Sequence, residues 1–444
     1  MSSQHRIADH QLTLLQNGAE FFPQLCADIA VAKNSIYLET YRLADDEIGR
    51  RVAEALQHAA ARGVVVRVLL DGFGSAELSP DWLDDWRIAG IEVQWFRREI
   101  STFRIRRHRL RRLHRKLVVI DGKTAYIGGI NIMDDVPAHV DLTSPQLDYA
   151  VCVQGVVVGE IHQAMQHLWG VVSWANFSRR GKQLDANEIV IDSARTVGDS
   201  TTPSPLVGEG WKEGDSEHFT LSLAHQGRGN RLLESLQFKF ANKQSRINKM
   251  HHTPSPTIVF LVRDNVRHRR DIERAYLRAI SSAQHEVIIA NAYFLPGRIF
   301  RRALKQATQR GVRVVLLLQG KIEYRIQHYA THFLYDELLA AGVEIYEYQA
   351  SYLHAKVAVV DRLWATVGSS NIDPFSLLLA REANLMVSDA GFAESLRANL
   401  LKAVINDAQR IEIGQQDYLT RFLSRISYGL VRFLVGITGV AKRH

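Results

Sequence analysis

A set of residues suited to phosphate chemistry occurs twice in this 444-residue chain, with the same internal spacing each time. The first set is His114-x-Lys116, followed at fixed intervals by Asp121, Gly128 and Asn131. One such pattern would be weak, but two copies with equal offsets indicate a duplicated protein whose halves build one site. The second copy consists of His354, Lys356, Asp361, Gly368 and Asn371.

The residue types in each copy explain what the site could do. Alternation along a strand places His114 and Lys116 on the same face. The ammonium group would neutralise phosphate oxygens while the imidazole attacks phosphorus or transfers a proton. A glycine-rich turn before Asn131 lets the backbone approach closely and brings a side-chain amide to the same oxygens.

Duplication supplies two imidazoles, as an in-line displacement at one phosphodiester requires. Near neutral pH one imidazole can be neutral and the other protonated. Two lysines and two asparagines balance the phosphate charge, so we expect neither a metal ion nor another cofactor.

The segments around the two copies also correspond to each other. Short apolar, β-branched runs alternate with amphipathic stretches, which predicts an α/β fold with a largely parallel sheet flanked by helices. A repeat of about 240 residues indicates domain duplication and not a solenoid. The matching runs are 35–43, 61–72, 89–96 and 113–121 in the first half, and 286–295, 309–320, 341–348 and 353–361 in the second.

Composition limits the class of protein. A chain of this length has room for two domains, and 46% hydrophobic residues fit a folded protein. Cys26 and Cys152 lie in apolar surroundings, which excludes a disulfide framework or a zinc knuckle. The net charge of +8 favours anionic partners without choosing between lipid and nucleic acid. The N-terminal residues show neither a signal peptide nor an 18-residue apolar run, so we expect a cytosolic or cytosolic-face location.

Four regions are predicted from these patterns. Residues 1–192 form the first domain, and 257–404 form the second. Residues 193–256, rich in Ser, Thr, Gly, Pro and charge, form a largely disordered linker or insertion. Residues 405–444 form a basic C-terminal tail.

The tail has a broad apolar face interleaved with arginines from Tyr418 onward. Gly429 and Arg432 interrupt the apolar character, so a helix lying in the membrane interface is favoured over a membrane span. The alternative is a helix docked on the protein core.

Two further patterns have a functional and a plain interpretation. The basic run 97–115, directly before the first motif, suits capture of anionic head groups, or it is a solvated loop. His328 and His332 have the spacing of a helical metal pair. No third ligand is evident, so a solvated helix face is expected.

The two motifs resemble the HKD motifs of the phospholipase D superfamily. Within it, the chain is similar to bacterial cardiolipin synthases, and most similar to their shorter B-type. The similarity covers nearly everything except 195–256 and is especially close over Trp364–Val387. It implies two phospholipase D-like α/β/α sandwich domains related by a pseudo-two-fold duplication, plus the amphipathic helical tail.

The resemblance also implies roles for the motif residues. His114 matches the nucleophile that forms a phosphohistidine, and His354 matches the acid that protonates the leaving alcohol and later deprotonates the acceptor. Gly129 replaces the usual serine, so one hydroxyl contact to phosphate is missing in the first half. The residues matching the phosphate-binding groups are Lys116, Lys356, Asn131, Asn371 and Ser369.

The resemblance assigns the four acidic residues to supporting roles. Asp121 and Asp361 belong to the catalytic motifs and are expected to support the motif loops without touching substrate. Glu382 matches a carboxylate that orients a motif histidine, and Asp148 is similar to its counterpart for His114. Alternatively, Glu382 and Asp148 are ordinary carboxylates.

Three functions remain open on the sequence. The resemblance implies a phosphatidyltransferase that makes cardiolipin and glycerol from two phosphatidylglycerols. The same histidines would serve a phosphodiesterase that uses water, either a phospholipase or a nuclease. The nuclease is less favoured because aromatic residues hardly alternate with the arginines of the basic run. The third possibility is a non-enzymatic scaffold on anionic membranes. Expected partners are phospholipid substrates and an anionic membrane, with no nucleic acid, and the expected place is peripheral, on the cytoplasmic side of the cell membrane.

Overall fold

The computed structural model describes residues 3–97, 111–136, 144–195, 256–264, 268–374, 376, 380–414 and 417–437, with the backbone alone for 178–195 and 436–437. Most of the basic run 97–115 and of the predicted linker therefore lies outside the described residues. One compact unit contains Met1–Asn176 together with Pro256–His444, and Phe177–Ser255 form a second unit. Both motif copies belong to the first unit, which is described below.

The first half builds a sheet in the order β1-β2-β9-β8-β7-β3-β4-β5. The β3–β4 and β4–β5 pairs are parallel, whereas β1–β2, β2–β9, β9–β8, β8–β7 and β7–β3 are antiparallel. The expectation of a largely parallel sheet was therefore wrong. The strands are β1 (Ser3–Ile7), β2 (His10–Gln16), β3 (Ser35–Thr40), β4 (Val65–Asp71), β5 (Glu92–Phe96), β7 (Leu117–Ile120), β8 (Thr124–Gly128) and β9 (Tyr149–Gln154).

The second half repeats this arrangement in the order β10-β16-β15-β14-β11-β12-β13-β17. Here β11–β12 and β12–β13 are parallel and the other pairs are antiparallel. The strands are β10 (Thr257–Arg263), β11 (Glu286–Asn291), β12 (Arg313–Gln319), β13 (Glu344–Tyr348), β14 (Lys356–Val360), β15 (Trp364–Gly368), β16 (Ala380–Ser388) and β17 (Ala408–Ile411).

A tight hairpin after each motif strand causes the antiparallel pairing. Asp121 and Gly122 both have positive φ, at 53° and 65°, between β7 and β8. Two left-handed residues form the turn whose twist matches adjacent strands, and Asp-Gly is a favoured sequence for it. Asp361 and Arg362 repeat the turn at 51° and 55°. The motif aspartate is thus also a turn residue.

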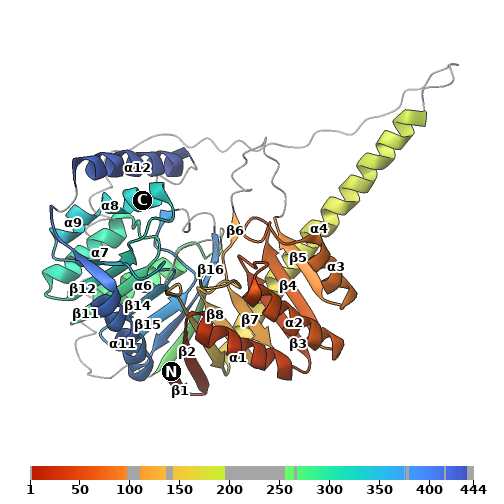
Figure 1. The fold of residues 1–444 in the computed structure, drawn as a ribbon, viewed down its shortest axis with the longest axis horizontal. Coiled ribbons are helices and arrows are strands. Elements are labelled where there is room, and N and C mark those ends of the chain that lie inside the picture. Colours follow the sequence, from red (N-terminus) through yellow and green to blue (C-terminus); the bar gives the residue numbers. More distant parts are fainter. Residues whose placement is uncertain are drawn as a thin grey trace, which may run out of the picture. The chain divides into compact units, whose positions relative to one another are not determined.

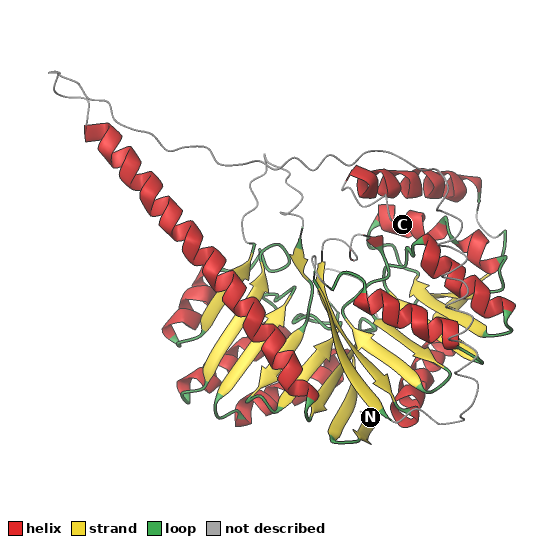
Figure 2. Ribbon diagram, turned by 180° about the vertical axis from the view of Figure 1, so that it is seen from behind, coloured by secondary structure: helices red, strands yellow, loops and turns green. Residues whose placement is uncertain are grey.

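Helices flank both sheets, and the two sheets share a central core. Figures 1 and 2 show the strands flanked by helices in both halves. The central core joins residues such as Val119 and Tyr149 of the first sheet to Val357 and Leu385 of the second. The helices are α1 (Asn17–Val31), α2 (Glu47–Ala61), α3 (Pro80–Ile88), α4 (Val157–Arg195), α6 (Asp271–Ser282), α7 (Arg298–Gln309), α8 (Arg325–His332), α9 (Tyr335–Leu339), α11 (Ala390–Asp407) and α12 (Tyr418–Ile437). The predicted boundaries at 192 and 404 thus fall inside α4 and α11. Each helix continues past the residue at which its amphipathic pattern stops.

The backbones of the two halves interlock at the motifs. The short strand β6 (Arg112–Leu113) pairs in parallel with the start of β16, and the amide of His114 donates to Arg381 O at 2.9 Å. Reciprocally, the amide of His354 donates to Leu147 O at 2.9 Å. Each histidine is therefore held by the backbone of the other half.

The tail helix α12 docks through its small residues. Tyr428 stacks on Phe333 of the α8 region with ring centroids 4.3 Å apart, and Ser424, Ser427 and Val431 are buried. The alternative of a docked helix thus holds for this face. Within the described residues, no helix is both long and apolar enough to cross a membrane.

Candidate active site

The two motif lysines are buried beside their own histidines. Lys116 Nζ donates to His114 O at 3.0 Å, and Lys356 Nζ donates to His354 O. Burial and the charge of Lys356 lower the pKa of Lys116 to about 7, and burial lowers that of Lys356 to about 8. The two ammonium groups repel each other across the halves, so the structure brings both lysines to one place.

Each histidine is oriented by a carboxylate from the other half. His114 Nδ1 lies 3.1 Å from Glu382 Oε2, and His354 Nδ1 lies 2.6 Å from Asp148 Oδ2. The expectation that Asp148 serves His114 was therefore wrong. The interlocked backbones explain the exchange, because Asp148 directly follows Leu147, which binds the amide of His354.

The two histidine–carboxylate pairs differ electrostatically. Burial would raise the pKa of Glu382, but His114, Arg263 and Lys116 outweigh it and hold that pKa below its ordinary value. Burial raises the pKa of Asp148 to about 6. The Glu382 carboxylate therefore keeps its charge to a lower pH than the Asp148 carboxylate does.

Both imidazoles favour the neutral form. Burial lowers the pKa of His114, although Glu382 opposes the change. Burial and the charges of Lys356, Lys116 and His114 bring the pKa of His354 well below its ordinary value. The effect of His114 on the pKa of His354 places the two imidazoles in one common site.

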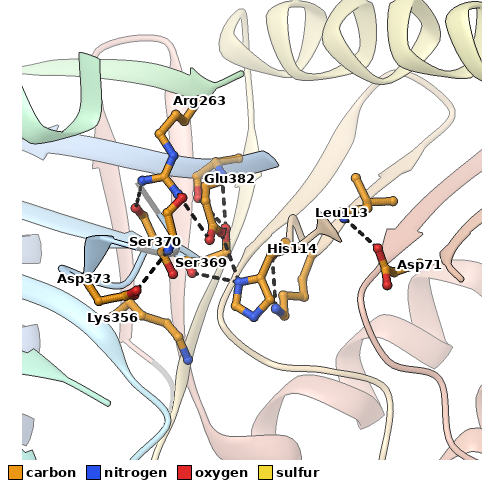
Figure 3. A network of polar contacts seen from close by, with 12 residues as sticks. Asp71, Leu113, His114, Arg263, Lys356, Ser369, Ser370, Asp373 and Glu382 are labelled. Carbon is orange, nitrogen blue, oxygen red and sulfur yellow. Dashed lines mark hydrogen bonds and ion pairs between the residues drawn. The ribbon is translucent and has the colours of Figure 1, made fainter. Parts of the chain in front are cut away.

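Arg263 is part of the site and was missed in the sequence. This side chain, 1% exposed at the end of β10, places Nη2 3.5 Å from Glu382 Oε1 and donates from Nη1 to Ser370 Oγ at 3.3 Å (Figure 3). The sequence indicated Arg263 only as a single charged residue at the end of the apolar run TIVFLVR. Asn17 occupies the position in the first half that is equivalent to Arg263, and its Oδ1 accepts from the amide of Asp148 at 3.1 Å.

Ser369 is occupied by a structural contact. Its fully buried hydroxyl donates to Glu382 Oε2 at 2.5 Å and accepts from the amide of Ala383 at 3.1 Å. The predicted phosphate contact from this hydroxyl is therefore wrong for this structure. At Gly129 an added Cβ would lie only 2.3 Å from Asp148 Oδ1, so the glycine makes room for the shorter carboxylate.

The motif aspartates lie outside the reacting groups. Asp121 accepts hydrogen bonds from the amides of residues 33–35 at 2.7–3.0 Å, and Asp361 accepts from those of residues 284–286 at 2.7–2.9 Å. These carboxylates are at the far end of the motif strands, roughly 20 Å from the histidines at 3.3 Å per residue. They fix the loops entering β3 and β11, in line with the supporting role expected for them.

The motif asparagines have unused polar atoms. The Oδ1 atoms of Asn131 and Asn371 are buried, without a hydrogen-bond partner among the described residues. Each asparagine follows the strand paired with its motif strand, β8 or β15. A buried amide with unused bonding capacity at this edge fits contact with a ligand.

Three other side chains missed in the sequence complete the surroundings. Asp71 Oδ2 accepts from the amide of Leu113 at 2.7 Å, and Gln319 Oε1 accepts from that of Leu353 at 2.6 Å. These two residues hold the segment before each histidine. The ring of Tyr41 lies 5.0 Å from that of His114, between centroids.

The pair His328 and His332 is neither on a solvated face nor in a metal cluster. His332 Nε2 lies 2.8 Å from Glu347 Oε1, and its ring stacks on Tyr335 at 4.5 Å. Both histidines are half-buried, so the expected solvated face was wrong. Across the part of the chain that the structure describes, no group of three or more His, Cys, Asp or Glu is arranged to hold a metal ion.

Fold and site together define a duplicated enzyme of phosphoryl-group transfer. A family model described as "Cardiolipin synthase, PLD-like domain" matches residues 25–169 and 276–403, one match in each half. The chain is 36% identical over 441 residues to cardiolipin synthase B of Salmonella typhi and 34% identical over 442 residues to that of Escherichia coli K12, with 98% of this chain and 91% of the relative covered in both cases. This chain belongs to the cardiolipin synthase family of the phospholipase D superfamily.

One solved structure supports the fold independently. A phosphatidylserine synthase of Haemophilus influenzae superposes with a TM-score of 0.59 at 14% identity, covering 99% of this chain and 96% of that one. At such low identity the likeness bears on the fold alone.

Proposed function

We propose that this protein transfers a phosphatidyl group from one phosphatidylglycerol to another, releasing glycerol and forming cardiolipin. The observation that carries the proposal is the pair of imidazoles, one from each half, each held at Nδ1 by a buried carboxylate beside two buried lysines. The curated relatives, which are cardiolipin synthases, supply the substrate class.

In the first step, Nε2 of His114 attacks phosphorus and the bond to the glycerol oxygen breaks. Glu382 is ionised beside Arg263 and accepts a hydrogen bond from the Nδ1–H group of His114. It thereby stabilises the positive charge of the phosphorylated imidazole. His354 gives its proton to the departing glycerol oxygen. The lysines and the motif amides bind the non-bridging oxygens.

In the second step, His354 removes the proton from a hydroxyl of the acceptor phosphatidylglycerol. The resulting oxygen attacks phosphorus, the bond to His114 breaks, and the diester product leaves. His354 can carry this proton because the anionic phosphate offsets the charges of the two lysines and thereby raises the pKa of His354.

The tail helix supports peripheral attachment to an anionic membrane, which we place on the cytoplasmic side of the cell membrane. Its small residues face the protein, so its bulky apolar residues project outward beside arginines. The exposed apolar residues of α12 are Tyr418, Leu419, Phe422, Ile426, Leu430, Phe433 and Leu434.

Labelled phosphatidylglycerol vesicles test the chemistry. Acid-quench trapping should yield a lipid adduct on His114 of the parent protein, and His114→Ala should lose adduct and cardiolipin by at least about a thousandfold. His332→Ala, a half-buried histidine outside the site, is the matched control and should retain synthesis. Cardiolipin made normally by His114→Ala would refute the assignment, whereas phosphatidic acid as the main product would replace transfer by hydrolysis.

A further inference from the structure

A tyrosine–glutamate pair lies at the second-half side of the site and has no part in the two steps above. Tyr293 follows β11, and Glu323 stands between β12 and α8. Tyr293 Oη donates to Glu323 Oε2 at 2.5 Å, and the Glu323 side chain remains exposed to solvent. The ring of Tyr324 lies 5.9 Å from that of Tyr293.

This pair lies beside the strand that carries Lys356. Asn291 pairs with Lys356, and the amide of Ala292, directly before Tyr293, donates to Ala355 O at 3.1 Å. Partial burial raises the pKa of Glu323, and the charges of Lys356 and Arg42 oppose that rise. The Glu323 carboxylate therefore lies near the phosphate-binding lysine.

The first half has no such carboxylate at the equivalent position. The amides of Gly72 and Gly320 bind Phe96 O and Tyr348 O, which aligns the two loops and matches Ser75 to Glu323. The Ser75 hydroxyl donates to Tyr41 O at 3.1 Å and accepts from the amide of Leu43 at 3.0 Å. Ser75 thus binds backbone, whereas the Glu323 carboxylate keeps one oxygen that Tyr293 does not bind.

The surrounding charges decide which ligand suits this acceptor. A carboxylate has acceptor sites on both oxygens, and Tyr293 binds Oε2. An ammonium head group would meet the repulsion of Lys356 and Arg42, while a neutral hydroxyl would not. Two hydroxyls on adjacent carbons can also bind together, one to the other carboxylate oxygen and one to the tyrosine hydroxyl.

We propose that Glu323 and Tyr293 form the subsite for the glycerol hydroxyls of the leaving and incoming head groups. This inference rests on the proposed transfer reaction and names the residues that select its alcohol. Glu323 gives the site its preference for a polyol over water or a simple alcohol, because a hydrogen bond to a charged acceptor strengthens binding of a matched hydroxyl by about 10- to 100-fold.

A donor without a glycerol head group separates the two proposals. Vesicles carrying phosphatidyl-p-nitrophenol release nitrophenolate when the intermediate forms, and added glycerol and ethanol then compete for the phosphatidyl group. In Glu323→Gln, release should stay within about twofold of the parent, while the glycerol-to-ethanol product ratio falls at least about tenfold. Tyr293→Phe should lower that ratio less, and Glu92→Gln, an exposed carboxylate paired with Arg67, should leave it unchanged.

Each outcome has one meaning. An unchanged glycerol-to-ethanol ratio in Glu323→Gln, with nitrophenolate release intact, overturns the subsite. A selective loss of transfer to ethanolamine, with the glycerol product preserved, also overturns it in favour of a cation subsite. Release that persists in His114→Ala refutes the phosphohistidine route, and the subsite as part of it, without any comparison of alcohols.

Discussion

At the scale of single residues, the two halves of the site hold their carboxylates by different means. Glu382 is backed by Arg263 and by the Ser369 hydroxyl. The Asp148 carboxylate lies close to Gly129 and accepts from the amide of Tyr149 at 2.8 Å, while Asn17 binds the backbone amide of Asp148. The second half thus combines the longer glutamate with a serine and an arginine. The first half combines the shorter aspartate with a glycine. The pKa of Glu382 is below its ordinary value, whereas that of Asp148 is above it.

The glycine beside Asp148 can be tested directly. Gly129→Ala should displace the Asp148 carboxylate and slow both steps that use His354, because its new Cβ would lie 2.3 Å from Oδ1. We expect at least about a tenfold fall in cardiolipin formation. Gly159→Ala, at a position with open space in α4, is the control and should leave cardiolipin formation unchanged. Normal turnover in Gly129→Ala would contradict this account.

The buried lysines predict a pH-dependent gain in stability on their removal. The pKa of Lys116 falls from 10.5 to about 7 in the folded protein, a cost of several kcal/mol at about 1.4 kcal/mol per pKa unit. The cost is full below pH 7 and disappears as pH rises to 10.5, because there the unfolded chain also loses the proton. Lys116→Met should therefore raise the thermal midpoint by several degrees at pH 6.

Thermal denaturation at several pH values checks the sign of this effect. The gain in Lys116→Met should shrink steadily between pH 7 and pH 10, with cardiolipin synthesis lost throughout. Lys123→Met, in the exposed turn between β7 and β8, is the control and should show no such trend. A midpoint lower than that of the parent at pH 6 would show that Lys116 stabilises the fold.

At the scale of elements, α12 is unusual in burying serines and exposing phenylalanines. Phe422 and Phe433 are 61% and 64% exposed, while Ser424 is 1% exposed. Phe422→Ser with Phe433→Ser should weaken sedimentation with phosphatidylglycerol vesicles by at least about tenfold, because two aromatic side chains lose their burial in lipid. The thermal midpoint should stay nearly constant, since these rings contribute little to the protein core.

A variant on the buried face of the same helix provides the matched control. Val431→Ala, at a position 1% exposed, should lower the thermal midpoint and affect vesicle binding much less. Equal sedimentation of the double serine variant and the parent would remove α12 from membrane attachment.

The elements also show how far the sequence could be interpreted. The motif runs predicted β7 and β14 and the helices between parallel strands, because periodicity is a local property. The Asp-Gly pair at Asp121 was available as a hairpin signal, and using it would have predicted the antiparallel β7–β8 pair. The partner of Asp148 could not be predicted. It depends on the pairing of segments about 200 residues apart, which no local pattern records. Arg263 was missed for the same reason.

At the scale of the whole molecule, the two halves share one central core and exchange backbone hydrogen bonds at the histidines. The predicted duplication was right, and the family match in both halves confirms it. The expectation of two separately bounded domains did not include this shared core, because the sequence pattern of each half was interpreted separately. The pseudo-two-fold arrangement brings the two motifs together, and in the proposed reaction they face one phosphorus atom from opposite sides.

The exchange of partners between the halves also has a consequence for biosynthesis. His114 emerges early from the ribosome, yet Glu382 and Arg381, which hold it, are made more than 260 residues later. A nascent chain therefore carries its attacking imidazole long before that imidazole is aligned. We therefore expect a chain truncated before residue 381 to be inactive, because its His114 lacks both of these partners.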